Sequence, residues 1–136
     1  MITRTACETI TTHIEKMRKA GRKIQQPVLG EATEHGTFVS PTIIEIDNIG
    51  QLGREVFGPV LHVMRYARKQ AGDVMEQINS TGYGLTFGLH SRIDKTIADI
   101  TALAQVGNVY INRNVIGAIV GVQPFGGRDL SGTGPK

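Results

Sequence analysis

The chain has 136 residues, a formal net charge of +3 at pH 7, 40% hydrophobic residues and 20% charged residues. This balance is typical of a soluble globular protein and excludes an intrinsically disordered chain. The sequence contains no run of about 18 apolar residues, so it predicts no membrane-spanning helix. Its start lacks the apolar core of a secretory signal, and a single cysteine excludes an internal disulfide framework. We therefore expect a cytoplasmic protein with one domain's worth of chain.

Basic residues gather in two short stretches, 16–23 and 65–69. Such clusters can mark a nucleic-acid surface. The first stretch contains no aromatic side chain that could stack on a base, and the second contains only Tyr66. Cations near the C-terminal turn of a helix also complement the helix dipole. We therefore interpret both stretches as solvated surface and expect no nucleic-acid partner.

Residues 3–20 have the pattern of an amphipathic helix, because apolar residues recur at spacings of three and four. This stripe consists of Ala6, Ile10, Ile14 and Met17. Thr3 or Thr5 can cap the N-terminus, and Thr5 with Glu8 has the spacing of a capping box. Gly21 follows Arg18 and Lys19 and provides a C-terminal stop.

Short extended and helical patterns alternate in the rest of the chain. Extended segments are predicted at 23–29, 38–47, 60–66, 85–89 and 109–112, and helices at 72–80 and 93–105, the second capped by Ser91. From residue 60 onward the order is β-α-β-α-β, which is typical of a parallel sheet with right-handed crossovers. Val109 to Ile111 form an apolar run, as in a strand covered on both faces. The sequence thus predicts the α/β class, a parallel sheet with flanking helices.

The segment from 114 to the end follows the last predicted strand, at the sheet edge where ligands bind in open α/β folds. Six glycines stand between residues 116 and 136, and a helix interior would not contain so many. A frayed tail is one interpretation. However, the segment also contains apolar residues that a solvated linker does not need, including Phe125. We interpret it as a packed loop that presents backbone N–H groups to a small ligand.

The C-terminal sequence VGVQPFGGRDLSGTGPK resembles the glycine-rich segment near the C-terminus of the aldehyde dehydrogenase superfamily. A second segment narrows the resemblance to the 1-pyrroline-5-carboxylate (L-glutamate γ-semialdehyde) dehydrogenases; it reads NVYINRNVIGAIVGVQ. Within these enzymes, the chain resembles the dehydrogenase module of bifunctional bacterial proline-utilisation proteins. Three further blocks match in the same order: EVFGPVLHVMRY, NSTGYGLTFGLHSRID and GNVYINRN. The resemblance therefore covers nearly the whole chain, as the C-terminal part of an aldehyde dehydrogenase catalytic domain.

This resemblance implies two binding sites. A carboxylate accepts hydrogen bonds from two vicinal ribose hydroxyls well, and in the family the glutamate and phenylalanine that match Glu55 and Phe57 hold the nicotinamide end of NAD. The resemblance implies that the loop residues Gly117 and Ala118 bind the substrate carboxylate through their backbone N–H groups. It also implies that Phe125 forms one wall of the aldehyde pocket. The pair Arg128-Asp129 replaces the His-Gly pair expected in the relatives, which leaves the geometry of that turn open.

The catalytic residues are not found in this chain. Thioester-forming aldehyde oxidation needs a cysteine nucleophile and a carboxylate base. Cys7 lies in the first turn of a helix, where a thiol can be reactive, but it lacks the family's surrounding motif, and we interpret it as a small apolar residue. No catalytic residue is assigned here, and the resemblance implies that nucleophile and base lie upstream of Met1. The isolated chain is therefore expected to be inactive.

No dinucleotide or P-loop glycine motif occurs in the sequence. The four histidines show no metal-ligand spacing, so we interpret them as structural and expect no metal. They are His13, His35, His62 and His90.

The implied reaction is the NAD-dependent oxidation of L-glutamate γ-semialdehyde to L-glutamate in proline catabolism. FAD would be needed only in a separate proline dehydrogenase module, if the parent is bifunctional, and such a parent could lie peripherally on the inner membrane face. Because cutting a domain exposes apolar surface, we also expect self-association. Two alternatives remain: a non-catalytic fragment that acts by association, and another aldehyde dehydrogenase subfamily. IGAIVGVQ argues against the second, because a generic member need not bind a carboxylate.

Overall fold

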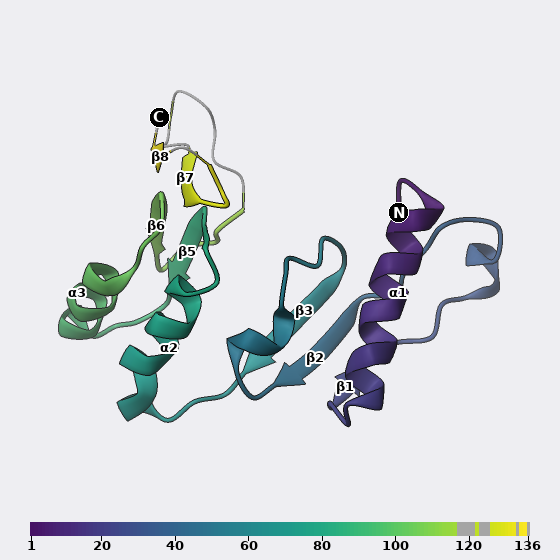
Figure 1. Ribbon diagram of the computed structural model, residues 1–136, viewed down its shortest axis with the longest axis horizontal. Helices are drawn as coiled ribbons and strands as arrows, with labels where there is room; N and C mark the ends of the chain where they lie inside the picture. Colours follow the sequence, from purple (N-terminus) through teal and green to yellow (C-terminus); the bar gives the residue numbers. More distant parts are fainter. Residues whose placement is uncertain (117–121, 123–125, 133, 136) are drawn as a thin grey trace. The chain divides into compact units, whose positions relative to one another are not determined.

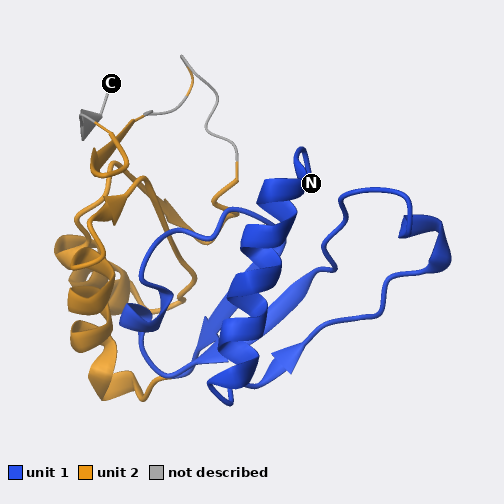
Figure 2. Ribbon diagram, turned by 45° about the vertical axis from the view of Figure 1, so that its right-hand side comes forward, with its two compact units in different colours: residues 1–65 blue, residues 66–136 orange. Residues whose placement is uncertain are grey.

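A computed structural model describes residues 1–116, 122, 126–132 and 134–135 of the chain (Figure 1). Its contacts divide the chain into two compact units, residues 1–65 (unit 1) and residues 66–136 (unit 2), drawn in two colours in Figure 2. Each unit contains a pair of parallel strands accompanied by at least one helix. This arrangement confirms the predicted α/β class.

Unit 1 is a three-stranded sheet with one long helix beside it (Figure 1). Its elements are α1 (Arg4–Lys19), β1 (Ile24–Gln25), the 3-10 helices η1 (Glu31–Thr33) and η2 (Ile49–Leu52), β2 (Thr42–Ile46) and β3 (Val60–Met64). Strands β2 and β3 are parallel, with Thr42 opposite Val60 and Ile46 opposite Met64, and β1 pairs antiparallel with β2. The sequence predicted all three strands, but β1 is shorter than the predicted segment 23–29.

Helix α1 begins and ends where its local sequence directs. Thr3 is the N-cap, and its hydroxyl accepts a hydrogen bond from the Ala6 N–H at 3.1 Å. The predicted capping box between Thr5 and Glu8 is wrong, because Thr5 already lies inside the helix. At the other end Gly21 adopts φ 72°, which suits a residue without a Cβ, and it closes the helix in a Schellman motif.

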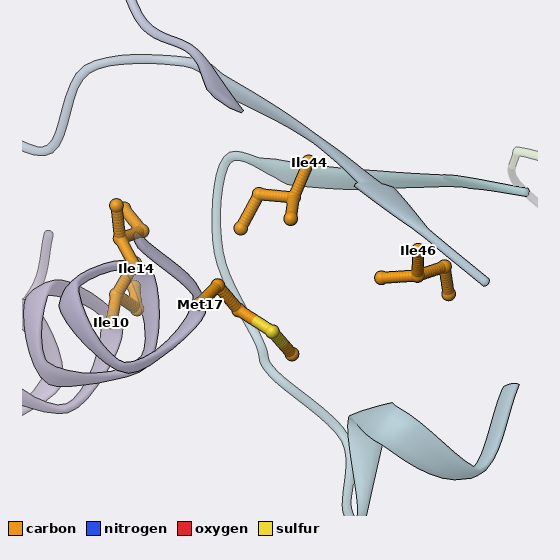
Figure 3. Close-up of a cluster of buried hydrophobic side chains, with 5 residues drawn as sticks. All are labelled: Ile10, Ile14, Met17, Ile44 and Ile46. Atoms are coloured by element: carbon orange, nitrogen blue, oxygen red, sulfur yellow. The ribbon is translucent and has the colours of Figure 1, made fainter. Parts of the chain in front are cut away.

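The apolar stripe of α1 forms the core of unit 1 with the inner face of β2 (Figure 3). The buried members are Ile10, Ile14, Met17, Ile44 and Ile46. Residues of a strand alternate between faces, so Ile43, between the buried Thr42 and Ile44, points away and is 39% exposed. The core therefore lies between helix and sheet, and it holds α1 over one face of β2.

The described residues of unit 2 form two α-helices, one parallel strand pair and a small antiparallel sheet (Figure 1). Its elements are η3 (Arg68–Gln70), α2 (Ala71–Asn79), β4 (Tyr83–Gly84), β5 (Thr86–Leu89), α3 (Asp94–Leu103), β6 (Asn108–Ile111), β7 (Gly126–Asp129) and β8 (Gly134–Pro135). Strands β5 and β6 are parallel, and β7 lies between β4 and β8. Helices α2 and α3 pack against each other.

Strands β5 and β6 pair in parallel, as the predicted β-α-β order implies. Two other sequence predictions about unit 2 are wrong in detail. Val109 is 38% exposed, whereas Asn108 and Tyr110 are buried, so β6 is not covered on both faces. The N-cap of α3 is Ile93 and not Ser91, whose hydroxyl instead accepts from the Ile93 N–H at 3.1 Å.

A close backbone approach holds β7 beside the start of β6. Gly107 faces the carbonyl oxygen of Gly126 so closely that a Cβ at position 107 would collide with it. The Asn108 side chain donates to the same Gly126 oxygen at 3.0 Å. Glycine is required at position 107 because two backbone segments occupy the space of a side chain.

Within the described residues, no helix has the length and apolarity to cross a membrane.

Candidate functional site

The segment between η2 and β3 carries the two predicted cofactor residues, Glu55 and Phe57. It leaves η2 through Gly53, which has φ 71°. Val56 is partly buried against the core of unit 1, whereas Glu55 and Phe57 on either side of it are exposed, Phe57 to 83%. One inward side chain thus anchors an extended segment, and its two neighbours are left free to contact a ligand.

The end of this segment is fixed to both α1 and the sheet. A Cβ on Gly58 would collide with the Ile10 side chain of α1, so the backbone lies directly on the helix there. The Pro59 carbonyl then accepts from the Thr42 N–H of β2 at 2.9 Å. The position of Phe57 is therefore set by contacts at the very next residues.

A cleft of about 730 Å³ lies between α1 and this segment. Glu55 and Phe57 line one wall, and the other wall is the polar side of α1. Its polar helix residues include Thr5, Glu8, Thr9, Thr12, His13 and Lys16. The sequence analysis missed these residues because it treated α1 only as a core helix. Their signal was a second stripe, Thr5, Thr9 and His13 at a spacing of four, on a side of the helix distinct from the apolar one.

Glu55 has neither a hydrogen bond nor an ion pair to any residue in the described parts of the chain. A solvated carboxylate on the wall of a cleft can accept two hydrogen bonds from adjacent hydroxyls. Phe57 offers an uncovered aromatic face two residues away. The structure therefore brings together the two predicted cofactor residues in one cleft, with free hydrogen-bonding and packing capacity.

Two histidines meet beside this cleft, although they are 49 residues apart in the sequence. His13 of α1 and His62 of β3 have their Nε2 atoms 2.9 Å apart, and the rings meet edge to face at 78°. Burial lowers the pKa of His13, and the nearby Lys16 charge lowers it further. Burial also lowers the pKa of His62, with a smaller contribution from His13. Among the described residues, no group of three or more potential metal ligands is found.

Cys7 lies outside the residues that line the cleft. Its side chain is half-buried, and its Sγ contacts the Phe38 carbonyl oxygen at 3.5 Å. The thiol is thus a packed side chain, and its weak S–H donor has an acceptor in this contact. The interpretation of Cys7 as a structural residue stays a prediction.

The root of the glycine-rich loop is fixed at the carboxyl end of β6. Asn112 adopts φ 55°, and its side chain exchanges two hydrogen bonds of 2.9 Å with the Ser91 backbone, which follows β5. Val115 then lies against Gly88 of β5. The ends of both parallel strands are therefore tied together where the loop begins. The predicted substrate residues Gly117, Ala118 and Phe125 lie outside the described residues.

The turn that differs from the expected relatives has an unusual backbone. Asp129 adopts φ 51°, a conformation that glycine adopts freely and that aspartate tolerates better than most residues. The Ser131 and Gly132 N–H groups donate to the carbonyls of Arg128 and Asp129 at 2.9 and 3.1 Å. A turn therefore forms at this position although Asp129 stands where glycine was expected.

Comparison with known proteins shows a match over the entire chain. Residues 1–136 match the aldehyde dehydrogenase family. The chain is 60% identical over 136 residues to the bifunctional protein PutA of Rhizobium meliloti, covering all of this chain and 11% of the relative. It is 37% identical over 139 residues to the 1-pyrroline-5-carboxylate dehydrogenase of Geobacillus sp. (strain WCH70), covering all of this chain and 26% of the relative.

A crystal structure of a bifunctional proline utilization A (PutA) protein superimposes with a TM-score of 0.90 at 50% identity, covering all of this chain and 14% of that one. The chain thus spans only about a tenth of the curated bifunctional relatives that it matches. This match concerns ancestry and fold. The two binding sites implied by the resemblance stay predictions. Because all of residues 1–136 match the aldehyde dehydrogenase family, the chain belongs to that family.

Proposed function

We propose that these residues form the C-terminal part of the catalytic domain of an NAD-dependent dehydrogenase, which oxidises L-glutamate γ-semialdehyde to L-glutamate in proline catabolism. The printed names of the relatives, PutA and 1-pyrroline-5-carboxylate dehydrogenase, support this substrate. The coverage of 11% and 26% of those relatives supports the assignment to part of a longer enzyme.

The observation that carries the proposal is the cleft wall formed by Glu55 and Phe57. Its residues fit the ribose and nicotinamide end of NAD, because an unpaired carboxylate and an 83% exposed aromatic ring stand two residues apart on a braced segment. Glu55 would accept hydrogen bonds from the ribose hydroxyls, and Phe57 would pack against the ribose. NAD, when bound, supplies a hydride acceptor.

The substrate carboxylate would bind the backbone N–H groups of Gly117 and Ala118, with Phe125 as a wall of the aldehyde pocket. This assignment rests on the family resemblance. It is supported by the position of the loop root, at the carboxyl edge of the β5–β6 pair. A charge-assisted hydrogen bond to a carboxylate is stronger than a neutral one, so such donors would favour a substrate that carries a carboxylate.

We assign no catalytic nucleophile or base to this chain, and FAD would belong to a separate module of a bifunctional parent. A cytoplasmic enzyme that self-associates completes the proposal. The face of the unit 1 sheet that points away from α1 supports association, since Leu61 there is 57% exposed. If the isolated chain oxidised glutamate semialdehyde in an assay of NADH formation, and Cys7→Ser abolished the activity, Cys7 would have to be the nucleophile.

The decisive experiment measures steady-state kinetics of an intact dehydrogenase that carries these residues. Glu55→Gln keeps the shape of the side chain but removes its charge. It should raise KM for NAD about tenfold to hundredfold, the effect of losing hydrogen bonds to a charged group, while KM for the aldehyde changes little. Phe57→Ala should also weaken NAD binding.

Glu34→Gln is the matched control, because Glu34 is an exposed carboxylate of unit 1 outside the cleft. It should leave KM for NAD unchanged. Equal values of KM for NAD in the wild-type, Glu55→Gln and Phe57→Ala enzymes would contradict the proposed cofactor site.

A further inference from the structure

The pairing of His13 with His62 is a contact between two titratable groups that the proposed chemistry does not use. At an Nε2–Nε2 distance of 2.9 Å, one nitrogen must donate a hydrogen and the other must accept it. The acceptor ring therefore lacks a proton on Nε2. The contact can form when both rings are neutral or when one is a cation, but two imidazolium rings would point N–H against N–H.

The pair connects the two walls that form the cleft. His13 belongs to the wall made by α1. His62 lies on β3, which directly follows the segment of Glu55 and Phe57 and the turn at Gly58 and Pro59. The histidine contact is thus a polar link between the helix wall and the strand that continues from the opposite wall.

The surroundings of the pair determine how readily it accepts a second positive charge. Strand β2 places the buried Ile44 opposite His62, so it adds no titratable group on this face. The charged groups that share the cleft with His13 are Glu8, Lys16, Arg54 and Glu55. Lys16 disfavours a second positive charge on the pair. In the described parts of the chain, neither ring has a carboxylate partner that would compensate such a charge.

We propose that His13 and His62 are positioning residues for the cofactor cleft: their hydrogen bond sets the spacing between α1 and the Glu55–Phe57 segment, and protonation of both rings releases it. This inference rests on the proposed function only for the identity of the ligand as NAD. The link between helix and strand is a property of unit 1 itself.

The direction of the pH effect follows from the lowered pKa values of both histidines. A base whose pKa is lower in the folded state is stabilised in its neutral form, and that stabilisation is complete above its unfolded pKa of about 6.5. As the pH falls below this value through the folded-state pKa values, the contribution is lost. The link should therefore be closed at pH 8 and open when the solution becomes acidic enough to protonate both rings.

The first experiment observes the pair without NAD. Long-range ¹H–¹⁵N NMR of the imidazole rings in the 136-residue chain, recorded between pH 8.5 and 4.5, should show His13 and His62 titrating as a coupled pair, with the protonation of one ring altering the shift of the other. In a His62→Gln variant, His13 should titrate in a single step. If His13 titrates identically in both proteins, the two rings are not linked and the proposal is overturned.

The second experiment measures KM for NAD against pH in an intact dehydrogenase that carries these residues. The wild-type KM should rise by about twofold to tenfold from pH 8 to the acid end, the effect of one lost hydrogen bond. His62→Gln can still hydrogen-bond to His13 but cannot carry a charge, so its KM should show a weaker rise. His35→Gln, which changes an exposed histidine of unit 1, should follow the wild-type profile.

The outcomes of these experiments distinguish the positioning role of the histidines from the proposed binding of NAD. An equal acid-induced rise of KM in the wild type and in His62→Gln would overturn the positioning role. Failure of NAD to bind at any pH would contradict the proposed function, whereas the NMR titration would still decide whether the histidines are linked.

Discussion

Units 1 and 2 each contain a parallel strand pair, but they prepare their candidate sites at opposite ends of a strand. In unit 1 the segment of Glu55 and Phe57 enters β3 and presents side chains. In unit 2 the glycine-rich loop leaves β6, and its proposed donors are backbone groups. The first arrangement depends on a core that braces the segment from behind. The second starts from a root at which Asn112 and Val115 tie the ends of β5 and β6 together.

The largest effect that would test this comparison is expected in the unit 1 core. Ile44 is fully buried, so Ile44→Ala should lower the free energy of unfolding by about 2–5 kcal/mol, through lost burial and the cavity left behind. Native-state hydrogen exchange can follow amides of unit 1 separately from those of unit 2. Leu61→Ala, at a 57% exposed position, should cost much less. Equal losses in the two variants would mean that the core does not brace unit 1.

A second prediction separates the backbone site from the side-chain site. In an intact dehydrogenase that carries these residues, Ala118→Leu should raise KM for glutamate semialdehyde about tenfold to hundredfold, because the new side chain would hinder the approach of the carboxylate to backbone N–H groups. A simple aliphatic aldehyde needs no such approach and should be affected little, whereas Phe125→Ala should weaken both. If Ala118→Leu impaired both substrates equally, the carboxylate anchor would lie elsewhere.

The close approach in unit 2 gives a third prediction. Gly107→Ala places a methyl group against the Gly126 carbonyl, and moving backbone to accommodate it should cost about 1–3 kcal/mol of stability. Gly72→Ala is the matched control, because a Cβ there meets open space in helix α2 and should be stabilising. Chemical denaturation followed by tyrosine fluorescence reports on unit 2, which holds all three tyrosines. A neutral Gly107→Ala variant would show that this junction adapts easily.

The smallest effect is expected at the turn after β7. Asp129→Gly removes the steric cost of φ 51° but makes the unfolded chain more flexible. The two contributions partly cancel, so we expect a gain of no more than about 1 kcal/mol. Asp129→Ala, which has a Cβ and lacks the polar side chain, should be destabilising. Thermal unfolding of the three proteins decides this, and an Ala variant as stable as the Gly variant would remove the backbone explanation.

Local features of the chain were predictable from its sequence. The bounds of α1 follow from Thr3 and Gly21, and its buried stripe follows from the spacing of Ile10, Ile14 and Met17. Strand pairing was less predictable, because hydrogen bonds between strands depend on distant segments. The order of elements predicted the parallel pair of β5 and β6, but no sequence pattern identified β2 as the parallel partner of β3.

The candidate site was predictable only in part. The roles of Glu55 and Phe57 came from a family resemblance, and the alternation around the inward Val56 explains why both are exposed. The contribution of α1 to the cleft was missed, because its polar side looked like ordinary solvated surface. The histidine pair was missed for a different reason: no local spacing relates His13 to His62, and only the packing of α1 on β3 brings them together.

The register of β2 and β3 has a consequence for insertions and deletions. Adding or removing one residue at 60 or 61 would turn every following side chain of β3 to the opposite face, and His62 would no longer face α1. A length change between η2 and Val56 would leave that register intact, because Pro59 and Thr42 fix it downstream. Variation in chain length should therefore be accepted on one side of Gly58 and rejected on the other.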